Sequence, residues 1–296
     1  MAKARELRRR IRSVENTRKI TKTMEMVATS KLKRAQDRVL AARPYAGALS
    51  ELIGDLYTPD LAERFPLLRQ PAGAPRRAAL VLITSNRGLC GAFNGNLIRV
   101  ARQRMSELRE AGAEVELHGI GRKGIGYFRY VGQALASQRQ DIGDRPTPAH
   151  AAEVMAPLME RFGAGELDAV EVVFAHFKSP LSTPPTVMRI LPVARPERGG
   201  GREGRAGGSA PNYILRPSAE EIVGAVLPLY VRNQMYRALV ETAAAEQGAR
   251  RTAMKNATDS AGEMIDVLRR TFNRARQAQI TQEIAEIVGG AEALKG

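Results

Sequence analysis

The last quarter of the chain has the heptad pattern of a long helix that packs against another helix. Steps of four and three residues from Val226 reach mostly apolar and small residues: Val240, Ala243, Met254, Ala257, Ala261, Met264 and Leu268. The pattern predicts one helix over residues 218–289. About 70 residues at 1.5 Å each would make a rod of roughly 105 Å, about twice the diameter of a compact globule of this chain length. We therefore expect this helix to protrude.

Both ends of this helix carry capping residues. Ser218 and Glu221 fit a capping box, and the glycine pair 289–290 fits a stop in the left-handed conformation. Pro228 removes one backbone hydrogen bond, so we expect it to bend or restart the helix.

The N-terminal segment has a matching pattern over residues 1–57. Steps of four and three reach a second largely apolar series: Leu7, Ile11, Val14, Thr21, Ala28, Leu32, Ala35, Val39, Leu49 and Ile53. We expect the two helices to pair, with Gly54 and Pro59 ending the first and Pro44 as a possible kink. A second apolar stripe one position away (Ile20, Met24 and Val27) should turn some side chains outward, because the true helical period is 3.6.

The residues between the helices alternate short β-branched runs with helical stretches. The predicted strands cover 78–84, 114–120, 169–177 and 186–193, and the predicted helices cover 94–109, 122–130 and 149–162. Continuous apolar strands separated by helices are typical of a mainly parallel sheet covered on both faces. The fold class is therefore α/β plus long helices, with a Rossmann-like α/β domain at 76–194 and a Gly-rich linker at 195–217.

The amino-acid composition further limits the class of protein. Hydrophobic residues make up 44% of the chain and aromatic residues 5%, with no Trp, which suits a helix-rich protein with a modest core. The longest apolar run, 78–83, is far short of the ~18 residues that span a bilayer, and no apolar stretch follows the basic N-terminus. We expect a protein of the cytoplasmic side. The single Cys90 excludes a disulfide within the chain.

Positive charge is concentrated at the N-terminus. Residues 1–43 hold fourteen Lys and Arg against four acids, a difference of +10 out of a net +15. An acidic partner is implied, and nucleic acid is one alternative. Against it, no aromatic residue precedes Tyr45 for base stacking, and the basic residues surround the helix instead of following one face. A partner protein with an acidic surface fits at least as well, and so does a plain solvated surface.

Two glycine loops raise an enzyme alternative. Gly119, Gly121 and Gly124 spell G-x-G-x-x-G after a strand, a pattern of dinucleotide-binding folds, but the following helix is short and its aromatic residues favour packing. The loop 85–94 could hold an anion at the start of a helix that Asn94 would cap. The simpler interpretation is a tight turn that needs Gly88 and Gly91.

Catalytic and metal-binding patterns are absent from the sequence. The three histidines, His118, His150 and His176, lack ligand spacing. Asp141 and Asp144 lie in a Gly-Pro loop, where capping a turn is the simpler role. We therefore predict no catalytic residue, no cofactor and no bound metal.

Three segments together resemble the gamma subunit of the F-type rotary ATP synthase, of the bacterial type. They are IRSVENTRKITKTMEMVATSKLKRAQ near the start, SNRGLCGAFN in the middle and NRARQAQITQEIAEIVGGA near the end, in the right order and at the right distances. The resemblance covers nearly the whole chain.

The resemblance implies a rotor. In that family the terminal helices form an antiparallel coiled coil inside a ring of alpha and beta subunits. The α/β domain, together with the epsilon subunit, lies on the proteolipid (c) ring. The chain would then be a non-catalytic peripheral protein on the cytoplasmic face of the plasma (inner) membrane, touching the membrane only through the ring and binding no nucleic acid.

Individual residues match family positions. Arg276 and Gln277 match the pair that binds a loop of a beta subunit, and Met24 matches a position beside the acidic lever of beta. The remaining matches are the basic residues near that lever (Lys22, Lys31, Lys33 and Arg34) and the tip in the apolar collar of the hexamer (Ile280, Ile284 and Ile287).

The chain also departs from the family. Tyr213 fits the side facing the ring and epsilon, but Arg216 stands where some relatives have a carboxylate. The Gly-rich stretch 195–211 and Pro228 are unusual, which puts the geometry of the lower end in doubt. The cysteine pair of chloroplast relatives is missing, so we predict no thiol switch.

Overall fold

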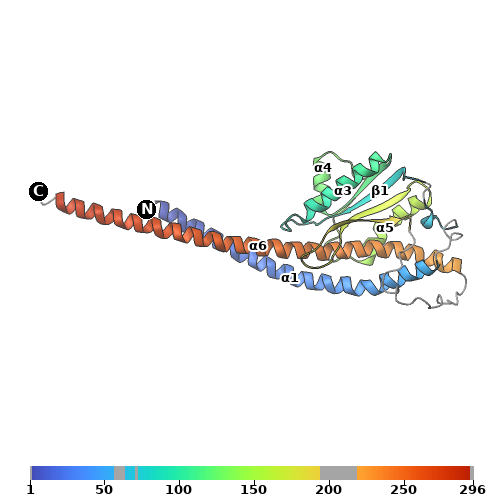
Figure 1. Ribbon diagram of the computed structural model, residues 1–296, viewed down its shortest axis with the longest axis horizontal. Coiled ribbons are helices and arrows are strands. Elements are labelled where there is room, and N and C mark those ends of the chain that lie inside the picture. Colours follow the sequence, from blue (N-terminus) through green and yellow to red (C-terminus); the bar gives the residue numbers. More distant parts are fainter. Residues whose placement is uncertain (1, 57–63, 71–72, 194–218, 294–296) are drawn as a thin grey trace, which may run out of the picture. The chain divides into compact units, whose positions relative to one another are not determined.

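The computed structural model describes residues 2–56, 64–70, 73–193 and 219–293 (Figure 1). The chain divides into two compact units. The helical unit contains residues 1–29 and 250–296, and the body contains residues 30–249. Helices α1 (Ala2–Leu56) and α6 (Ala219–Ala293) contribute to both units. The predicted linker, with Tyr213, Arg216 and the capping Ser218, lies outside the described residues, as does Pro59.

In the helical unit, α1 and α6 pair in opposite directions. Three contacts fix the register between them: Thr21 with Thr258, Glu15 with Arg269 at 2.7 Å, and Arg8 over the Phe272 ring at 5.5 Å. Residue numbers fall along α1 as they rise along α6, so the pair is antiparallel. The predicted antiparallel coiled coil is confirmed.

The packed stripe of α1 follows the predicted heptads. Thr21 and Ala28 are buried, and the second stripe turns outward at Ile20 (60% exposed) and Val27 (50% exposed). On α6 the buried positions of this unit are Met254, Thr258, Ala261 and Ile265. The heptad series counted from Val226 places Met264 in the packed stripe. That placement is wrong, because Met264 is 54% exposed and Ile265 is buried instead. The series is right at Met254 and Ala261, but Thr258 and Ile265, each one residue later than the predicted Ala257 and Met264, are the buried positions after them.

The long helices continue through their prolines, and α6 continues through its last glycine pair. Pro44 lies inside α1 and Pro228 inside α6. Helix α6 also continues through the glycine pair 289–290 to Ala293, so these glycines do not stop it. Glycine in a helix interior costs only about 1 kcal/mol, and a left-handed stop is one option for it among others.

The body is built on a five-stranded sheet with the order β3-β2-β1-β4-β5. The strands are β1 (Arg77–Ile83), β2 (Glu114–Ile120), β3 (Ser137–Arg139), β4 (Ala169–Ala175) and β5 (Pro185–Leu191). Neighbours among β1 to β4 run parallel, whereas β5 runs antiparallel to β4. Four of these strands match the predicted runs. The short β3 and the reversed direction of β5 were not predicted.

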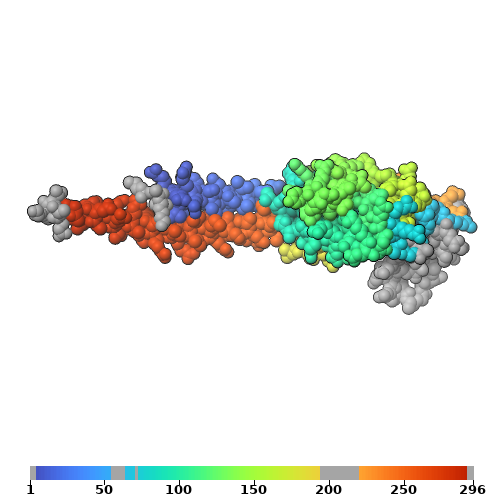
Figure 2. Space-filling model, turned by 90° about the horizontal axis from the view of Figure 1, so that it is seen from above, coloured from blue at the N-terminus to red at the C-terminus, as the bar shows by residue number. Residues whose placement is uncertain are grey.

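Helices cover both faces of this sheet. Helices α3 (Phe93–Glu110), α4 (Arg122–Tyr130) and α5 (Pro148–Gly163) match the predicted helices to within one residue at each end. A short 3-10 turn, η1 (Pro66–Leu68), precedes β1. In Figure 2 the surface of the body turned to the viewer is formed largely by the green part of the sequence, which contains α3 and α4.

Alternate residues of β1 enter two different apolar cores. Val81 packs with residues of α5 and α6, among them Met155 and Leu239. Leu80 packs on the other face with residues of α3 and α1, among them Leu97 and Val39. Because both faces are covered, β1 is an unbroken apolar run from Ala78 to Ile83, and the prediction of a mainly parallel, doubly covered sheet is confirmed.

Candidate partner-binding site

Helix α6 extends past the start of its partner in the helical unit (Figure 1). Arg8 lies over Phe272, and α1 begins at Ala2. Because both helices rise equally per residue, α1 begins beside roughly the sixth residue after Phe272. The described part of α6 after that point has no α1 segment beside it, and it continues to Ala293.

Three isoleucines lie on this unpaired segment and are exposed. Their exposed fractions are 47% for Ile280, 56% for Ile284 and 71% for Ile287. Spacings of four and three residues place them on one face of the helix. These isoleucines form an apolar stripe that is exposed to water and has no partner helix. Such a stripe indicates a surface that binds another molecule.

Arg276 lies one turn before Ile280 on the same face, and Gln277 lies beside it. Both residues are exposed. Within the described ranges Arg276 makes no ion pair, and the backbone oxygen of Gln277 accepts the Thr281 hydroxyl at 3.0 Å. The predicted pair and the predicted tip therefore share one accessible surface of α6.

The basic residues predicted on α1 differ in their contacts. Lys22 in the helical unit binds Glu25 at 3.1 Å. In the body, Lys31 binds Asp144 at 2.7 Å and Lys33 binds Asp37 at 3.0 Å. Arg34 is exposed and has no ion pair with any described residue. Exposed pairs of this kind are worth about 0–1 kcal/mol, so an acidic partner could exchange with them. Met24, the remaining residue of this set, is half-buried.

The G-x-G-x-x-G loop is filled by the protein itself. Gly121 has a φ of +94°, and a Cβ placed there would lie 2.0 Å from the Thr84 backbone oxygen. The Thr84 hydroxyl donates to the Ile120 carbonyl at 3.0 Å and accepts the Gly124 amide at 2.9 Å. These glycines let the end of β1 pack directly against the start of α4, and this packing accounts for the motif.

The loop 85–94 is a braced turn. The Ser85 amide donates to Asn94 Oδ1 at 3.0 Å, and Asn94 Nδ2 donates to Ser85 Oγ at 2.8 Å. Asn94 is not the N-cap of α3, which is Ala92. Positive φ occurs at Leu89 and Gly91, so only the second of the two predicted glycines has the left-handed conformation.

Asp141, Asp144 and His150, three of the residues considered for chemistry in the sequence, each contact a neighbouring side chain. The Arg139 guanidinium, hydrogen-bonded to the Asp141 carboxylate, lowers the pKa of Asp141 to about 2. Lys31 likewise lowers the pKa of Asp144. His150 forms a capping box with Thr147 at the start of α5. Over the described residues, no group of three or more His, Cys, Asp or Glu side chains could hold a metal ion.

Two buried carboxylates escaped the sequence analysis. Glu171 on β4 is 2% exposed and binds Arg104 Nε at 2.6 Å and Arg189 Nη2 at 2.9 Å. Burial tends to raise the pKa of Glu171, but the hydrogen bonds from both guanidinium groups outweigh it and lower the pKa. The sequence did contain one sign of a buried carboxylate here, because Glu171 is a single acidic residue within an otherwise apolar predicted strand. Glu241 is the second such residue, inside an apolar stretch of α6.

Comparison with known proteins agrees with this architecture. The family model described as ATP synthase matches residues 3–294. The class is therefore a subunit of an ATP synthase. The ATP synthase gamma chain of Gemmatimonas aurantiaca is 62% identical over 296 residues, with all of both chains covered. The gamma chain of Moorella thermoacetica is 45% identical over 295 residues, also over all of both chains. The chain belongs to the ATP synthase gamma-chain family.

Solved structures share the fold. A chain of the Tetrahymena thermophila mitochondrial ATP synthase, in a structure of the central stalk and c-ring, has 27% identity and a TM-score of 0.60, with 80% of this chain and 99% of that chain covered. A chain of the Euglena gracilis mitochondrial enzyme reaches a TM-score of 0.66 at 19% identity, with 99% of this chain and 95% of that chain covered. None of the described helices has a stretch long and apolar enough to cross a membrane.

Proposed function

We propose that this gamma chain is the central-stalk rotor of a proton-translocating ATP synthase. It transmits torque between the proteolipid ring in the membrane and the beta subunits, where ATP is made or hydrolysed. It contributes no catalytic residue and no cofactor site of its own. It acts as a peripheral protein on the cytoplasmic face of the bacterial plasma membrane.

The unpaired end of α6 carries the proposal. A helix that ends in an exposed apolar stripe needs a surrounding apolar surface, and the collar of an alpha and beta hexamer would supply one. Ile280, Ile284 and Ile287 then form the part of the rotor held in that collar. Arg276 and Gln277, on the accessible surface just before it, hydrogen-bond a beta subunit. A guanidinium group suits this role because it offers several donors in a fixed plane.

The α1 surface supplies the second proposed contact with beta. Met24 and Lys22, together with Lys31, Lys33 and Arg34, face the acidic lever of a beta subunit during rotation. Weak ion pairs are suited to contacts that form and break in each turn. Among the four basic residues, Arg34 starts without an ion pair to a described residue and should contribute most.

The lower end of the rotor meets the epsilon subunit and the c-ring. Tyr213 and Arg216 are proposed for this side, and both lie outside the described residues. Membrane contact is then indirect, through the ring. An enzyme that binds a dinucleotide is not favoured, because the Gly121 loop is occupied by Thr84.

Reconstitution tests the proposal. The full chain is mixed with alpha and beta subunits, and the stability and ATPase rate of the complex are measured. We expect a stable complex whose turnover depends on the chain, and a weaker complex for Arg276→Ala. The matched control is Arg274→Ala, since Arg274 is also exposed and lies about 200° away around the helix. Equal assembly and turnover without the chain would refute the rotor function, and equal losses from both variants would refute the contact assigned to Arg276.

A further inference from the structure

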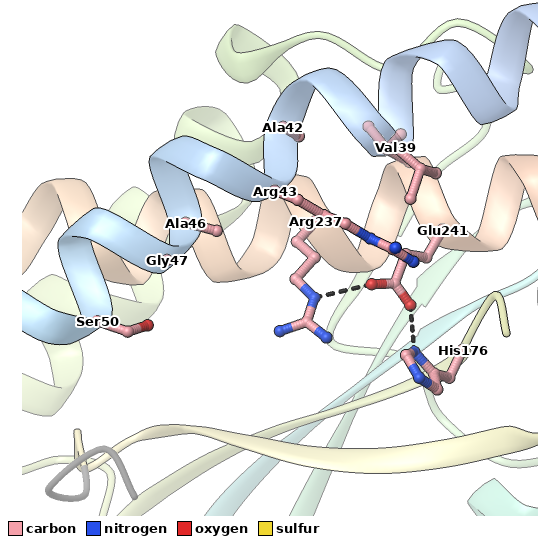
Figure 3. Close-up of a pocket in the computed structure, with 10 residues that line it drawn as sticks. Val39, Ala42, Arg43, Ala46, Gly47, Ser50, His176, Arg237 and Glu241 are labelled. Atoms are coloured by element: carbon pink, nitrogen blue, oxygen red, sulfur yellow. Dashed lines mark hydrogen bonds and ion pairs between the residues drawn. The ribbon is translucent and has the colours of Figure 1, made fainter. Parts of the chain in front are cut away.

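The body contains a pocket of about 380 Å³ between α1, α6 and the end of β4 (Figure 3). Its volume is within the range of small-molecule sites, which is roughly 300–1,000 Å³. The wall on the helices is apolar, with Val39, Ala42 and Ala46 from α1 and Val240 from α6. The proposed rotor contacts use none of these residues.

The same two helices also supply charged groups to the lining, Arg43 from α1 and Arg237 and Glu241 from α6. Glu241, 2% exposed, accepts Arg237 Nε at 2.7 Å through one oxygen. Its other oxygen lies 2.5 Å from His176 Nδ1 and accepts the Phe177 amide at 3.1 Å. Both oxygens of this buried carboxylate are therefore already bound within the body, and Glu241 holds Arg237 in place instead of facing a ligand.

Two guanidinium groups remain able to bind something else. In the described part of the chain, Arg237 uses only its Nε, which leaves its two terminal amino groups as donors. Arg43 lines the same pocket, and no described residue forms an ion pair with it. Figure 3 shows the Arg43 side chain extending from α1 toward the Glu241 side of the pocket. Two cations against one carboxylate leave a net positive charge in a concave site, which attracts an anion.

We propose that this pocket binds a small organic anion. Its carboxylate or phosphate group is held by Arg43 and Arg237, with the Ser50 hydroxyl as a further donor, and its apolar part lies against Val39 and Ala46. Arginine forks are the preferred donors for both kinds of oxyanion. A bound anion would link α1 to α6 within the body through one ligand.

Calorimetric titration of the full chain tests the proposal, with phenyl phosphate, benzoate and inorganic phosphate as probes. We expect phenyl phosphate or benzoate to bind at one site per chain. The probe with the higher affinity shows whether the site prefers a phosphate or a carboxylate group. Inorganic phosphate should bind at least about tenfold more weakly, because it has no apolar part. Equal binding of inorganic phosphate would overturn the role of the apolar wall, and no saturable binding of either organic probe would overturn the site.

Substitutions distinguish anion binding in this pocket from nonspecific attraction of anions to a basic protein. Arg43→Gln should weaken binding about tenfold, and Ala46→Leu should abolish it by filling the pocket. Both residues are at least partly exposed, so the thermal unfolding midpoint should stay unchanged. Arg99→Gln, which removes the same charge from an exposed position on α3 outside the pocket, should leave binding unchanged. Equal weakening by Arg99→Gln and Arg43→Gln would show nonspecific attraction and refute the proposal.

Discussion

Thr21 and Thr258 meet inside the helical pair, with their hydroxyl oxygens 2.8 Å apart. Each hydroxyl also lies within reach of a backbone oxygen of its own helix, 3.1 Å for Thr21 to Arg18 and 2.8 Å for Thr258 to Met254. A hydroxyl has one proton, so one threonine donates across the interface while the other donates to its own helix. The buried pair therefore forms a polar layer that only one register of the two helices can satisfy.

Replacing one threonine of this layer should destabilise the pair more than replacing both. Thr258→Val leaves the Thr21 hydroxyl buried beside a methyl group, at an expected cost of about 1 kcal/mol in the free energy of unfolding. The double variant Thr21→Val with Thr258→Val should recover most of this loss, because two valine side chains pack together and leave no buried hydroxyl without its partner. A double-mutant cycle by denaturant unfolding measures the coupling. Additive losses would show that the two hydroxyls do not act together.

Gly121→Ala should strongly destabilise the body. The new Cβ would lie 2.0 Å from the Thr84 oxygen, at a φ of +94° that alanine rarely adopts. We expect a loss of about 3 kcal/mol or more, measured by thermal or denaturant unfolding.

Gly126→Ala, inside the helix α4 that Gly121 precedes, is the matched control. Its Cβ would meet no atom within 4 Å. This substitution should stabilise the helix by roughly 0.5–1 kcal/mol. Similar effects of the two substitutions would contradict the close packing of Thr84 against the glycine loop.

Glu171→Gln should lower stability at neutral pH and matter less in acid. The variant removes the charge that Arg104 and Arg189 share, and because both arginines partly reach solvent we expect a loss of about 2 kcal/mol. The pKa of Glu171 is lower in the folded protein than its ordinary value of 4.5. The carboxylate therefore stabilises the fold above that value and loses its contribution as the pH falls through the folded pKa.

Unfolding curves from pH 7 to pH 3 check this prediction. The difference between the wild type and Glu171→Gln should shrink as the pH falls. Glu107→Gln removes an exposed carboxylate from the same Arg104 and should have little effect at any pH. A difference that stays constant down to pH 3 would mean that the charge of Glu171 is not what stabilises the sheet.

Ile284→Asp should separate folding from assembly. Ile284 is 56% exposed, so the substitution should change the unfolding free energy of the isolated chain by less than about 0.5 kcal/mol. In reconstitution with alpha and beta subunits, a charge in an apolar collar should sharply reduce complex formation. Asp259→Asn, a charge change at an exposed position on the same helix, serves as the control. Unimpaired assembly of the Ile284 variant would exclude this residue from the collar.

The sequence predicted elements where one local signal dominates. The runs that became β1 and β4 are mostly apolar, with Glu171 as the one acid within β4, because helices cover both faces, and the heptads of α1 correctly predicted buried Leu32 and Ala35. β3 was missed because its three residues, Ser137–Arg139, are polar and the first two are exposed at the sheet edge. The direction of β5 depends on the turn that follows β4, and strand periodicity is the same in either direction.

Local sequence patterns also could not predict which residues far apart in the sequence contact each other. Glu171 is 67 residues from Arg104, and Glu241 is 65 residues from His176. An acid inside an apolar run indicates that some partner exists, but only the packed sheet decides which partner it is. The residues proposed to contact other subunits are a different case, because they came from resemblance to a family. Those within the described residues are exposed in this chain, except Met24 and Lys31, which are half-buried.

The reversed last strand has a consequence for how the body could have been inserted between the two helices. Leu191, at the end of β5, is registered with Val170 on β4, and Val170 with Ala79 near the start of β1. The polypeptide thus enters the sheet at the start of β1 and leaves it at the end of β5, both at the same end of the strands, whereas a parallel β5 would release it at the opposite end. A short loop could therefore join the two ends of residues 66–193, but the deletion would uncover α6 side chains that the sheet buries, among them Val231, Met235 and Leu239.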